Sequence, residues 1–322
     1  MLTLNSPHLV VQVREVRIEM ERLRYCSCKV SNGVSWKMYL TYIEQVFDTI
    51  DRFPSITAVK RGFIPNHNLC ENQPYNFSNT PLSVCIVSDD ILTNLFRKLH
   101  STRSIQRLQI ENIGPFTHPG LQASEFRASA GNNRSQALRN LKDLRLHVAY
   151  DKSLNNKTKT NNLVATLAEL PSLWLRPAAA SLCHLTLGCH EVLFGYYPKL
   201  DLKGVHFPCL KTLALRNFAF SHEWQLEWLT SHSDTLREAY LGNCAVLVAN
   251  DTNMSMDADS YPIHGTLHFI HGIYTYGSTV QYPLRWDAIF DVCKRLPHLR
   301  QFGCGAISPG KHWERHLQPP TT

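Results

Sequence analysis

Two groups of cysteine and histidine residues in this chain have spacings that could bind a metal ion. Cys26 and Cys28 are two positions apart, and His67 and Cys70 are three positions apart further along. Thiolate and imidazole are the ligands that structural zinc sites use. However, Cys-x-Cys is a weaker zinc pattern than Cys-x-x-Cys. We therefore favour a pair of small residues that ends a structural unit, with an unrelated loop further along, over a zinc site.

The second group, His264, His268 and His271, has the i, i+4, i+7 spacing that would align metal ligands on one helix face. Gly265 and Gly272 make a helix unfavourable in this segment. Scattered loop or strand histidines are therefore the preferred interpretation. We predict no metal and no cofactor.

Motifs for covalent catalysis and for phosphate binding are missing from the sequence. The chain has no G-x-S-x-G and no P-loop, and the segment 303–305 is a lone G-x-G. Carboxylates such as Asp143 and Glu238 fall on expected strand surfaces, where solvent or a partner is the usual neighbour. We predict that the chain is not an enzyme, and we keep a metal-dependent enzyme that uses the cysteine and histidine groups as a third hypothesis.

The composition is that of a globular protein with a large core. Of 322 residues, 43% are hydrophobic and 18% are charged. The 33 basic and 26 acidic residues give a net charge of +7, a mild excess that does not favour a nucleic-acid or membrane partner. No apolar run approaches the ~18 residues of a membrane span, and the start lacks the pattern of a signal peptide. The ten cysteines are sparse and indicate reduced thiols. We expect a cytoplasmic or nuclear protein.

The dominant pattern is a recurring apolar spacing, L-x-x-L-x-L. In the segment "FPCLKTLALRNF", it places Leu210, Leu213 and Leu215 on the side of a strand that faces a core. Counting from the middle apolar residue, the copies centre on positions 16, 59, 108, 144, 185, 213, 239 and 302. The copy around position 59 is weaker, because Arg61 occupies its third apolar site.

Apolar stripes with helical spacing lie between the copies, over 43–50, 92–99, 163–170, 222–231 and 286–296. Alternating short strands and helices predict an α/β fold with a parallel sheet. A sustained repeat predicts a leucine-rich-repeat-like solenoid with strands on the concave side and helices on the convex side. We expect one irregular solenoid over 1–305 and a C-terminal tail over 306–322. Loop insertions are expected near 61–88, 150–162 and 248–283.

The unit "FPCLKTLALRNFAF" followed by "SHEWQLEWLTSHSDTLREAYLGNCAVL" resembles the leucine-rich repeats of fungal F-box proteins. Cys244 is ninth from Leu236, where cysteine-type repeats place Asn or Cys, whereas Phe218 occupies the equivalent site after Leu210. The resemblance covers about residues 9–305. Members of that family carry an N-terminal F-box, a helical module with a Leu-Pro start that docks on a Skp-type adaptor of a cullin ubiquitin ligase. We find no such segment here.

The resemblance implies a protein–protein interaction scaffold, a substrate-recognition arm related to the F-box subunits of cullin-type ubiquitin ligases. The alternative is a stand-alone leucine-rich-repeat binding protein with no ubiquitin role. Its partner would be a protein, and a Skp-type adaptor would bind only if an F-box were supplied upstream.

Residues that flank the middle apolar position of each copy point away from the core, because side chains alternate along a strand. Side chains from different copies should therefore share one exposed surface. Arginine and tyrosine often dominate protein interfaces. The predicted partner-binding residues are Arg107, Arg145, His147, His184, Arg216, Glu238 and Tyr240. A competing site would use the tyrosines of the last insertion, which are Tyr261, Tyr274, Tyr276 and Tyr282.

Overall fold

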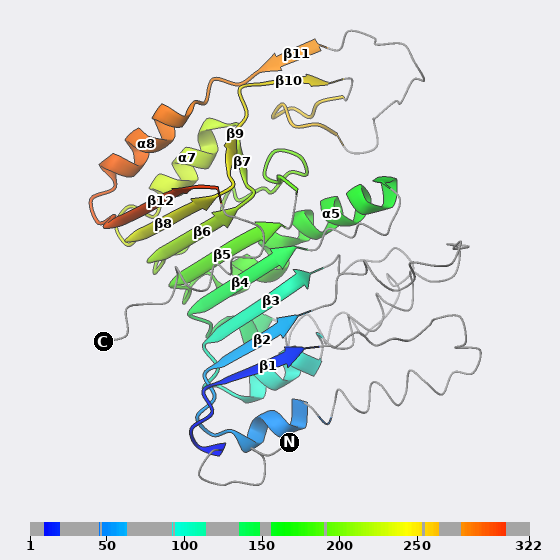
Figure 1. Cartoon of the computed structure of the whole chain (residues 1–322), viewed down its shortest axis with the longest axis vertical. Coiled ribbons are helices and arrows are strands. Elements are labelled where there is room, and N and C mark those ends of the chain that lie inside the picture. The colour runs from blue at the N-terminus through cyan, green and yellow to red at the C-terminus, as the bar shows by residue number, and fades with distance from the viewer. Residues whose placement is uncertain are drawn as a thin grey trace, which may run out of the picture.

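The computed structural model is built on an eight-stranded parallel sheet whose strand order, β1-β2-β3-β4-β5-β6-β8-β12, follows the chain (Figure 1). The structure describes residues 10–19, 45, 47–62, 92, 94–113, 135–148, 156–189, 192–252, 255–263 and 278–306. The strands are β1 (Glu15–Glu19), β2 (Ala58–Gly62), β3 (Arg107–Ile113), β4 (Asp143–Val148), β5 (His184–Cys189), β6 (Thr212–Arg216), β8 (Glu238–Gly242) and β12 (Gln301–Gly305).

All eight copies of the apolar spacing lie in one register. The middle residues pair across the sheet in the order Val16, Val59, Leu108, Leu144, Leu185, Leu213, Ala239 and Phe302. A one-residue slip would turn every apolar side chain to the wrong face, so the spacing specifies the register as well as the strands. The predicted α/β class and the parallel pairing of the strands around 185 and 213 are confirmed.

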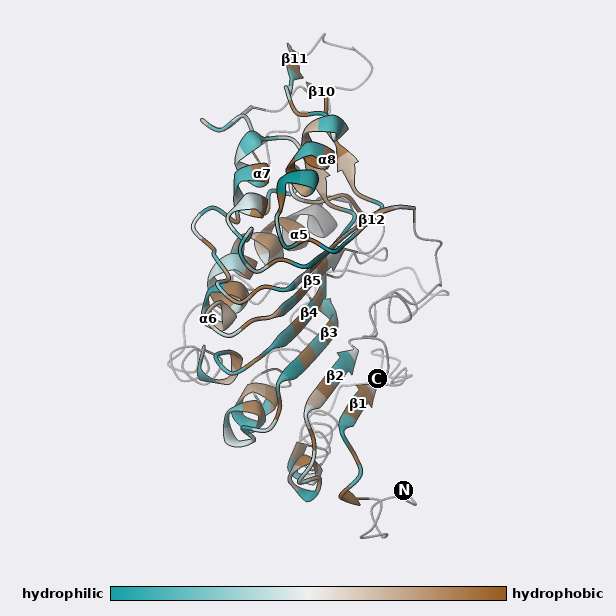
Figure 2. Ribbon diagram, turned by 90° about the vertical axis from the view of Figure 1, so that its left-hand side faces the viewer, coloured by the Kyte–Doolittle hydropathy of each residue, from teal (hydrophilic) through white to brown (hydrophobic). Residues whose placement is uncertain are grey.

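The helices lie on one side of this sheet (Figure 2). They are α5 (Asn156–Leu170), the π-helical turn η6 (Pro171–Leu175), α6 (Arg176–Ala178), α7 (Glu223–Thr230) and α8 (Trp286–Arg295). A 3-10 turn, η3 (Ile50–Arg52), and helical residues 94–101 precede β2 and β3. The core fills the space between the sheet and the helices, where Leu185, Leu213 and Leu215 are buried as expected.

The predicted insertion over 150–162 is not a loop throughout, because α5 begins at Asn156. Leu163, Leu167 and Leu170 on the later turns are buried and anchor this helix to the core. A helix that is fixed by packing extends over neighbouring polar residues even where their helix propensity is low.

The predicted insertion over 248–283 also contains regular structure. Strands β10 (Ala249–Thr252) and β11 (Ser278–Gln281) pair antiparallel and form a separate two-stranded sheet. A second small sheet is parallel and pairs β7 (Ala219–Phe220) with β9 (Ala245–Val246). Of the insertion predicted near 61–88, residues 63–88 lie outside the described residues.

The weak copy joins the sheet despite its arginine. Arg61 is 1% exposed and occupies the third apolar site of β2, on the same face as Val59. Its Nη1 donates a hydrogen bond to the Ile18 carbonyl at 3.4 Å. The long aliphatic stem of arginine can fill an apolar position while its head group bonds to the backbone.

Candidate functional site

The face of the sheet opposite the helices carries the residues at which the apolar spacing has polar or small side chains, and we call it the open face. Because side chains alternate along each strand, residues that pair in register form rows across this face. One row contains Arg107, Asp143, His184 and Glu238, and the next contains Arg145 and Tyr240. Arg216 and His147 belong to a third row, on either side of Gly188. All seven predicted residues therefore lie on this face, on five different strands.

Around β3 and β4 the open face is an ion-pair network centred on Asp143, which is 5% exposed. Arg145 donates two hydrogen bonds to its carboxylate, from Nε to Oδ1 at 3.0 Å and from Nη2 to Oδ2 at 2.9 Å. Arg107 donates from Nε to Oδ2 at 2.8 Å, and its Nη1 lies 4.0 Å from a Glu15 carboxylate oxygen. Two of the predicted partner-binding arginines are therefore already held by carboxylates of the same face.

Around β5 and β6 the same face holds an arginine in a different state. Arg216 is half-buried, and its Nε is a buried donor with no hydrogen-bond partner within the part of the chain that the structure describes. Burial lowers the pKa of its guanidinium. A desolvated cation that lacks a counterion gains more from an incoming anion than a solvated one does. This arginine is the strongest candidate on the face for contact with a partner carboxylate.

Gly188 shapes the surface beside Arg216. A Cβ at this glycine would lie 3.3 Å from Arg216 Cβ and 3.4 Å from His147 Cδ2. Real Cβ atoms seldom have contacts that short, so glycine provides the room in which the two larger side chains face one another. The Arg216 Cβ and the His147 imidazole thus lie against one glycine of β5.

Tyr240 and Glu238 form a third arrangement, on β8. The Tyr240 hydroxyl and the Thr212 hydroxyl each donate to Glu238 Oε2 at 3.3 Å. Burial, and then the charge of Glu238, raise the pKa of Tyr240 to about 12, so its phenol keeps its proton at neutral pH. The ring lies against Gly303, where an added Cβ would be 3.0 Å from Tyr240 Cδ1. The hydrogen bonds that Glu238 accepts here thus come from neutral hydroxyl groups.

The competing tyrosine site is corrected in part, because two of its four tyrosines are core residues. Tyr261 is 0% exposed and Tyr282 is 3% exposed. The Tyr282 and Tyr196 hydroxyl oxygens are 2.7 Å apart, and Trp224 Nε1 donates to the Tyr261 hydroxyl at 3.0 Å. The His222 ring stacks on Tyr261 with 4.1 Å between centroids. These two side chains hold the insertion against the body of the protein and are unavailable as interface anchors.

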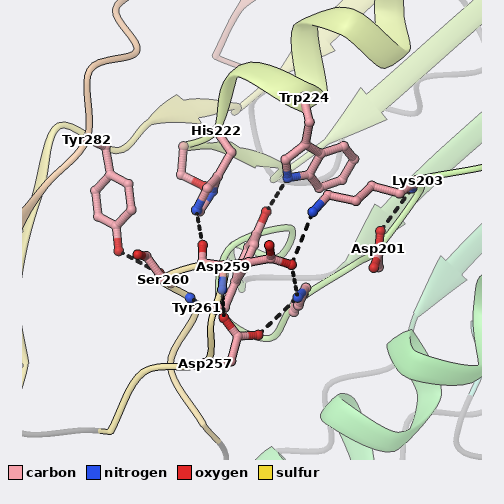
Figure 3. Close-up of polar contacts among 11 residues, drawn as sticks. Asp201, Lys203, His222, Trp224, Asp257, Asp259, Ser260, Tyr261 and Tyr282 are labelled. Atoms are coloured by element: carbon pink, nitrogen blue, oxygen red, sulfur yellow. Dashed lines mark hydrogen bonds and ion pairs between the residues drawn. The ribbon is translucent and has the colours of Figure 1, made fainter.

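Ion pairs complete this attachment, as Figure 3 shows. Lys199 Nζ lies 3.0 Å from Asp257 Oδ2, and Lys203 Nζ lies 3.1 Å from Asp259 Oδ2. Lys199 also lies over the Tyr261 ring, 4.2 Å from its centroid. The described part of the insertion is thus fixed by aromatic packing and by charge.

The other sequence-predicted sites fall outside the described residues. These are Tyr274 and Tyr276 of the insertion and the candidate metal ligands Cys26, Cys28, His67, Cys70, His264, His268 and His271. Within the described ranges, no three His, Cys, Asp or Glu side chains gather as metal ligands would. No helix in those ranges is long and apolar enough to cross a membrane.

The sequence contains a further pattern, separate from the apolar spacing, which is an asparagine that recurs after the third apolar residue. Asn112, Asn217 and Asn243 each lie two positions after the third apolar residue, and each has a positive φ between 51° and 61°. Asparagine tolerates this left-handed conformation better than most residues. Asn217 Nδ2 also donates to the Cys189 carbonyl at 2.6 Å. Asn217 and Asn243 directly follow β6 and β8, whereas Asn112 lies within β3, at the register shift between Ile110 and Ile113.

No protein-family model matches this chain, and no curated protein is significantly similar to it.

Proposed function

We propose that the chain is a leucine-rich-repeat-like solenoid that binds a protein partner on the open face. The solenoid interpretation is supported by the eight in-register strands that follow chain order and by the left-handed asparagines that follow β6 and β8. Repeat proteins of this kind stack one unit on the next and use the resulting continuous surface for binding. The open face would be the concave side and the helices would form the convex side.

The observation that carries the binding proposal is Arg216. Buried donors are nearly always paired, and because the Arg216 Nε lies on the open face, we take it as the group that a ligand completes. His147 lies across Gly188 from it on β4, and Tyr240 lies on the adjacent strand β8, one row away. The partner therefore presents a carboxylate side chain to Arg216.

We further propose that this protein is a substrate-recognition arm related to F-box subunits, on the resemblance of segment 207–247 to that family. The described chain then supplies recognition, and adaptor docking needs an F-box. Joining an F-box upstream should confer binding to a Skp-type adaptor, measured by co-purification. Tight adaptor binding by the 322-residue chain alone would contradict this division of labour.

The binding proposal is tested by site-specific photocrosslinking in cells. A photoreactive amino acid at position 184, which is exposed on the open face, should capture a discrete partner. The matched control is position 227, an exposed residue of α7 on the helix side. Arg216→Ala should abolish the crosslink from position 184, while Glu227→Ala should leave it unchanged. A crosslink that forms only from position 227 would place the binding surface on the helices.

A further inference from the structure

An open depression of about 590 Å³ lies where the chain enters β3, β4 and β5, away from the open face. Its volume falls in the range of ligand sites for small molecules, ~300–1,000 Å³. Arg103, Arg139, Lys142 and His100 line it, together with amide side chains such as those of Gln106 and Asn140. No carboxylate is among the described residues that line it. A concave site lined by one sign of charge concentrates ligands of the opposite sign.

The cations are not used by the protein itself. Within the described ranges, the side chains of Arg103, Arg139 and Lys142 make no ion pair and no hydrogen bond. In contrast, the arginines of the β3–β4 network are bonded to Asp143. The depression therefore offers three cationic side chains whose N–H donors are available to a ligand.

The backbone around these cations is held in place. The Ser181 hydroxyl lies 2.6 Å from the Arg139 carbonyl and 2.7 Å from the Leu141 carbonyl, so it ties the entry to β5 to the turn before β4. The Lys142 amide donates to the Gln106 carbonyl at 2.8 Å and ties that turn to the entry of β3. The backbone turns that carry these cations are therefore held in place relative to one another.

Along the same edge, the residue just before each strand forms a row bonded through the backbone. The row is Arg14, Thr57, Gln106, Lys142, Cys183, Lys211, Arg237 and Arg300. Five of these eight residues are cationic and none is acidic. This row is thus mainly cationic, and two of its members, Gln106 and Lys142, line the depression.

We propose that this depression binds a small anion that carries two or more phosphate groups. A guanidinium group binds two phosphate oxygens at once through two parallel hydrogen bonds. This geometry adds selectivity to the attraction between opposite charges. Arg103 and Arg139 come from neighbouring strand entries, and neighbouring strands are ~4.8 Å apart. Two phosphate groups of one ligand can therefore each have their own arginine, and Lys142 adds a third cation to the same depression. This site is separate from the open face and does not rest on the function proposed for it.

The test is calorimetric titration of the full chain with inorganic tripolyphosphate at about 150 mM salt, a concentration that screens diffuse attraction. Arg103→Ser/Arg139→Ser should weaken binding at least tenfold, because each arginine supplies a charge-assisted contact. Lys211→Ser/Arg237→Ser removes the same charge from the same edge outside the depression and should weaken binding less than threefold. The affinity of Arg139→Lys should lie between those of the wild type and the double serine variant. Lysine keeps the positive charge but cannot form the two parallel hydrogen bonds of a guanidinium. All these side chains are exposed, so circular dichroism should show folded variants.

Two further ligands identify the source of the phosphate. Tripolyphosphate binding without capture of phosphatidic-acid vesicles assigns a soluble ligand, whereas vesicle capture that Arg103→Ser/Arg139→Ser abolishes assigns a lipid headgroup. Three outcomes would overturn the proposal. They are equal losses in the two double variants, citrate binding as tight as that of tripolyphosphate, and binding of a single-stranded oligonucleotide with none of tripolyphosphate.

Discussion

The two halves of the open face differ in how their charged side chains are paired. Around β1 to β4, charges are paired within the face, as in Arg107–Asp143–Arg145 and in Lys60 with Glu111 at 3.2 Å. Around β5 to β12, Arg216 has a buried donor without a partner among the residues that the structure describes. Satisfied networks stabilise and orient a fold, whereas an unsatisfied buried group costs free energy that a ligand can recover. The first half therefore satisfies its own charges, and the second half is the part of the face for which we propose a binding role.

Asp143→Ala should have the largest effect on stability. It removes three charge-assisted hydrogen bonds. Arg145, whose side chain is 17% exposed, then loses the carboxylate that neutralises it. Breaking a buried pair costs ~3–5 kcal/mol. Because Arg107 is 44% exposed and can be solvated, we expect about 3 kcal/mol in urea unfolding. Asp143→Asn keeps an acceptor and should lose less. A loss below about 1 kcal/mol would show that the network is not structural.

His232, which lies behind the second half in the turn after α7, should make stability fall in acid. Burial, and then repulsion by His206, lower its pKa to about 4 from 6.5. Its Nε2 accepts from the Phe207 amide at 3.2 Å, and its Nδ1 lies 2.8 Å from the Trp228 carbonyl and donates to it. A proton on Nε2 would place an N–H donor opposite the Phe207 N–H donor, and the hydrogen bond between these two groups would be lost.

The sign of this effect follows from the lowered pKa. Above about pH 7 the imidazole is neutral in both states and the free energy of unfolding does not depend on it. As the pH falls from 6.5 towards 4, only the unfolded state takes up the proton, and stability decreases. The full loss is about 3 kcal/mol. His232→Phe should flatten this pH profile and cost about 2 kcal/mol at pH 7, because the Phe207 amide loses its acceptor. An unchanged profile in that variant would assign the acid sensitivity elsewhere.

Glycine replacements should distinguish the two halves at intermediate cost. Gly188→Val places a branched side chain against Arg216 and His147 and should cost about 1–2 kcal/mol, because both must move. Gly62→Val on β2 is the matched control, since a Cβ there meets nothing within 4 Å. We expect its effect on thermal unfolding to be within about 0.5 kcal/mol of zero. Equal effects would mean that the glycines do not separate the halves.

Arg216→Ala should have the smallest effect on stability and a large effect on binding. The change removes a buried donor without a partner, so the free energy of unfolding should move by less than about 0.5 kcal/mol. Partner capture should fall about thirtyfold, which corresponds to ~2 kcal/mol. Replacing Arg145, Arg216 and Tyr240 together would confuse the test, because loss of Arg145 also breaks the Asp143 network. The informative control is Arg107→Ala, which should reduce stability more than capture.

Much of the fold could be predicted from the sequence because burial along a strand is a local pattern. The spacing around Leu213 or Leu144 alternates inside and outside within six residues, and each copy could be found without its neighbours. Even the copy with Arg61 paired in register. The expected loops at 150–162 and 248–283 were less accurate. Polar residues give weak local signals there, and packing of Leu163 and Tyr261 decided the structure.

The candidate site was predictable only as a set of positions. Strand alternation placed Arg145, Arg216 and Tyr240 on one face, as the structure shows. It did not distinguish the arginine that is held by Asp143 from the arginine whose Nε has no partner among the described residues. The competing interpretation of the insertion treated Tyr261 and Tyr282 as interface anchors, although both are buried. Those differences depend on side chains from other strands and on the aromatic packing of the insertion.

The sequence by itself determined which residues form the strands of the eight-stranded sheet, which face of each is buried and how they pair, because these follow from a period of two residues repeated along the chain. Only the tertiary structure decided which charges neutralise one another. Arg107 and Asp143 are 36 residues apart in the chain yet 2.8 Å apart across the sheet. An ion pair depends on that lateral distance and on burial, and neither quantity is written in any single repeat.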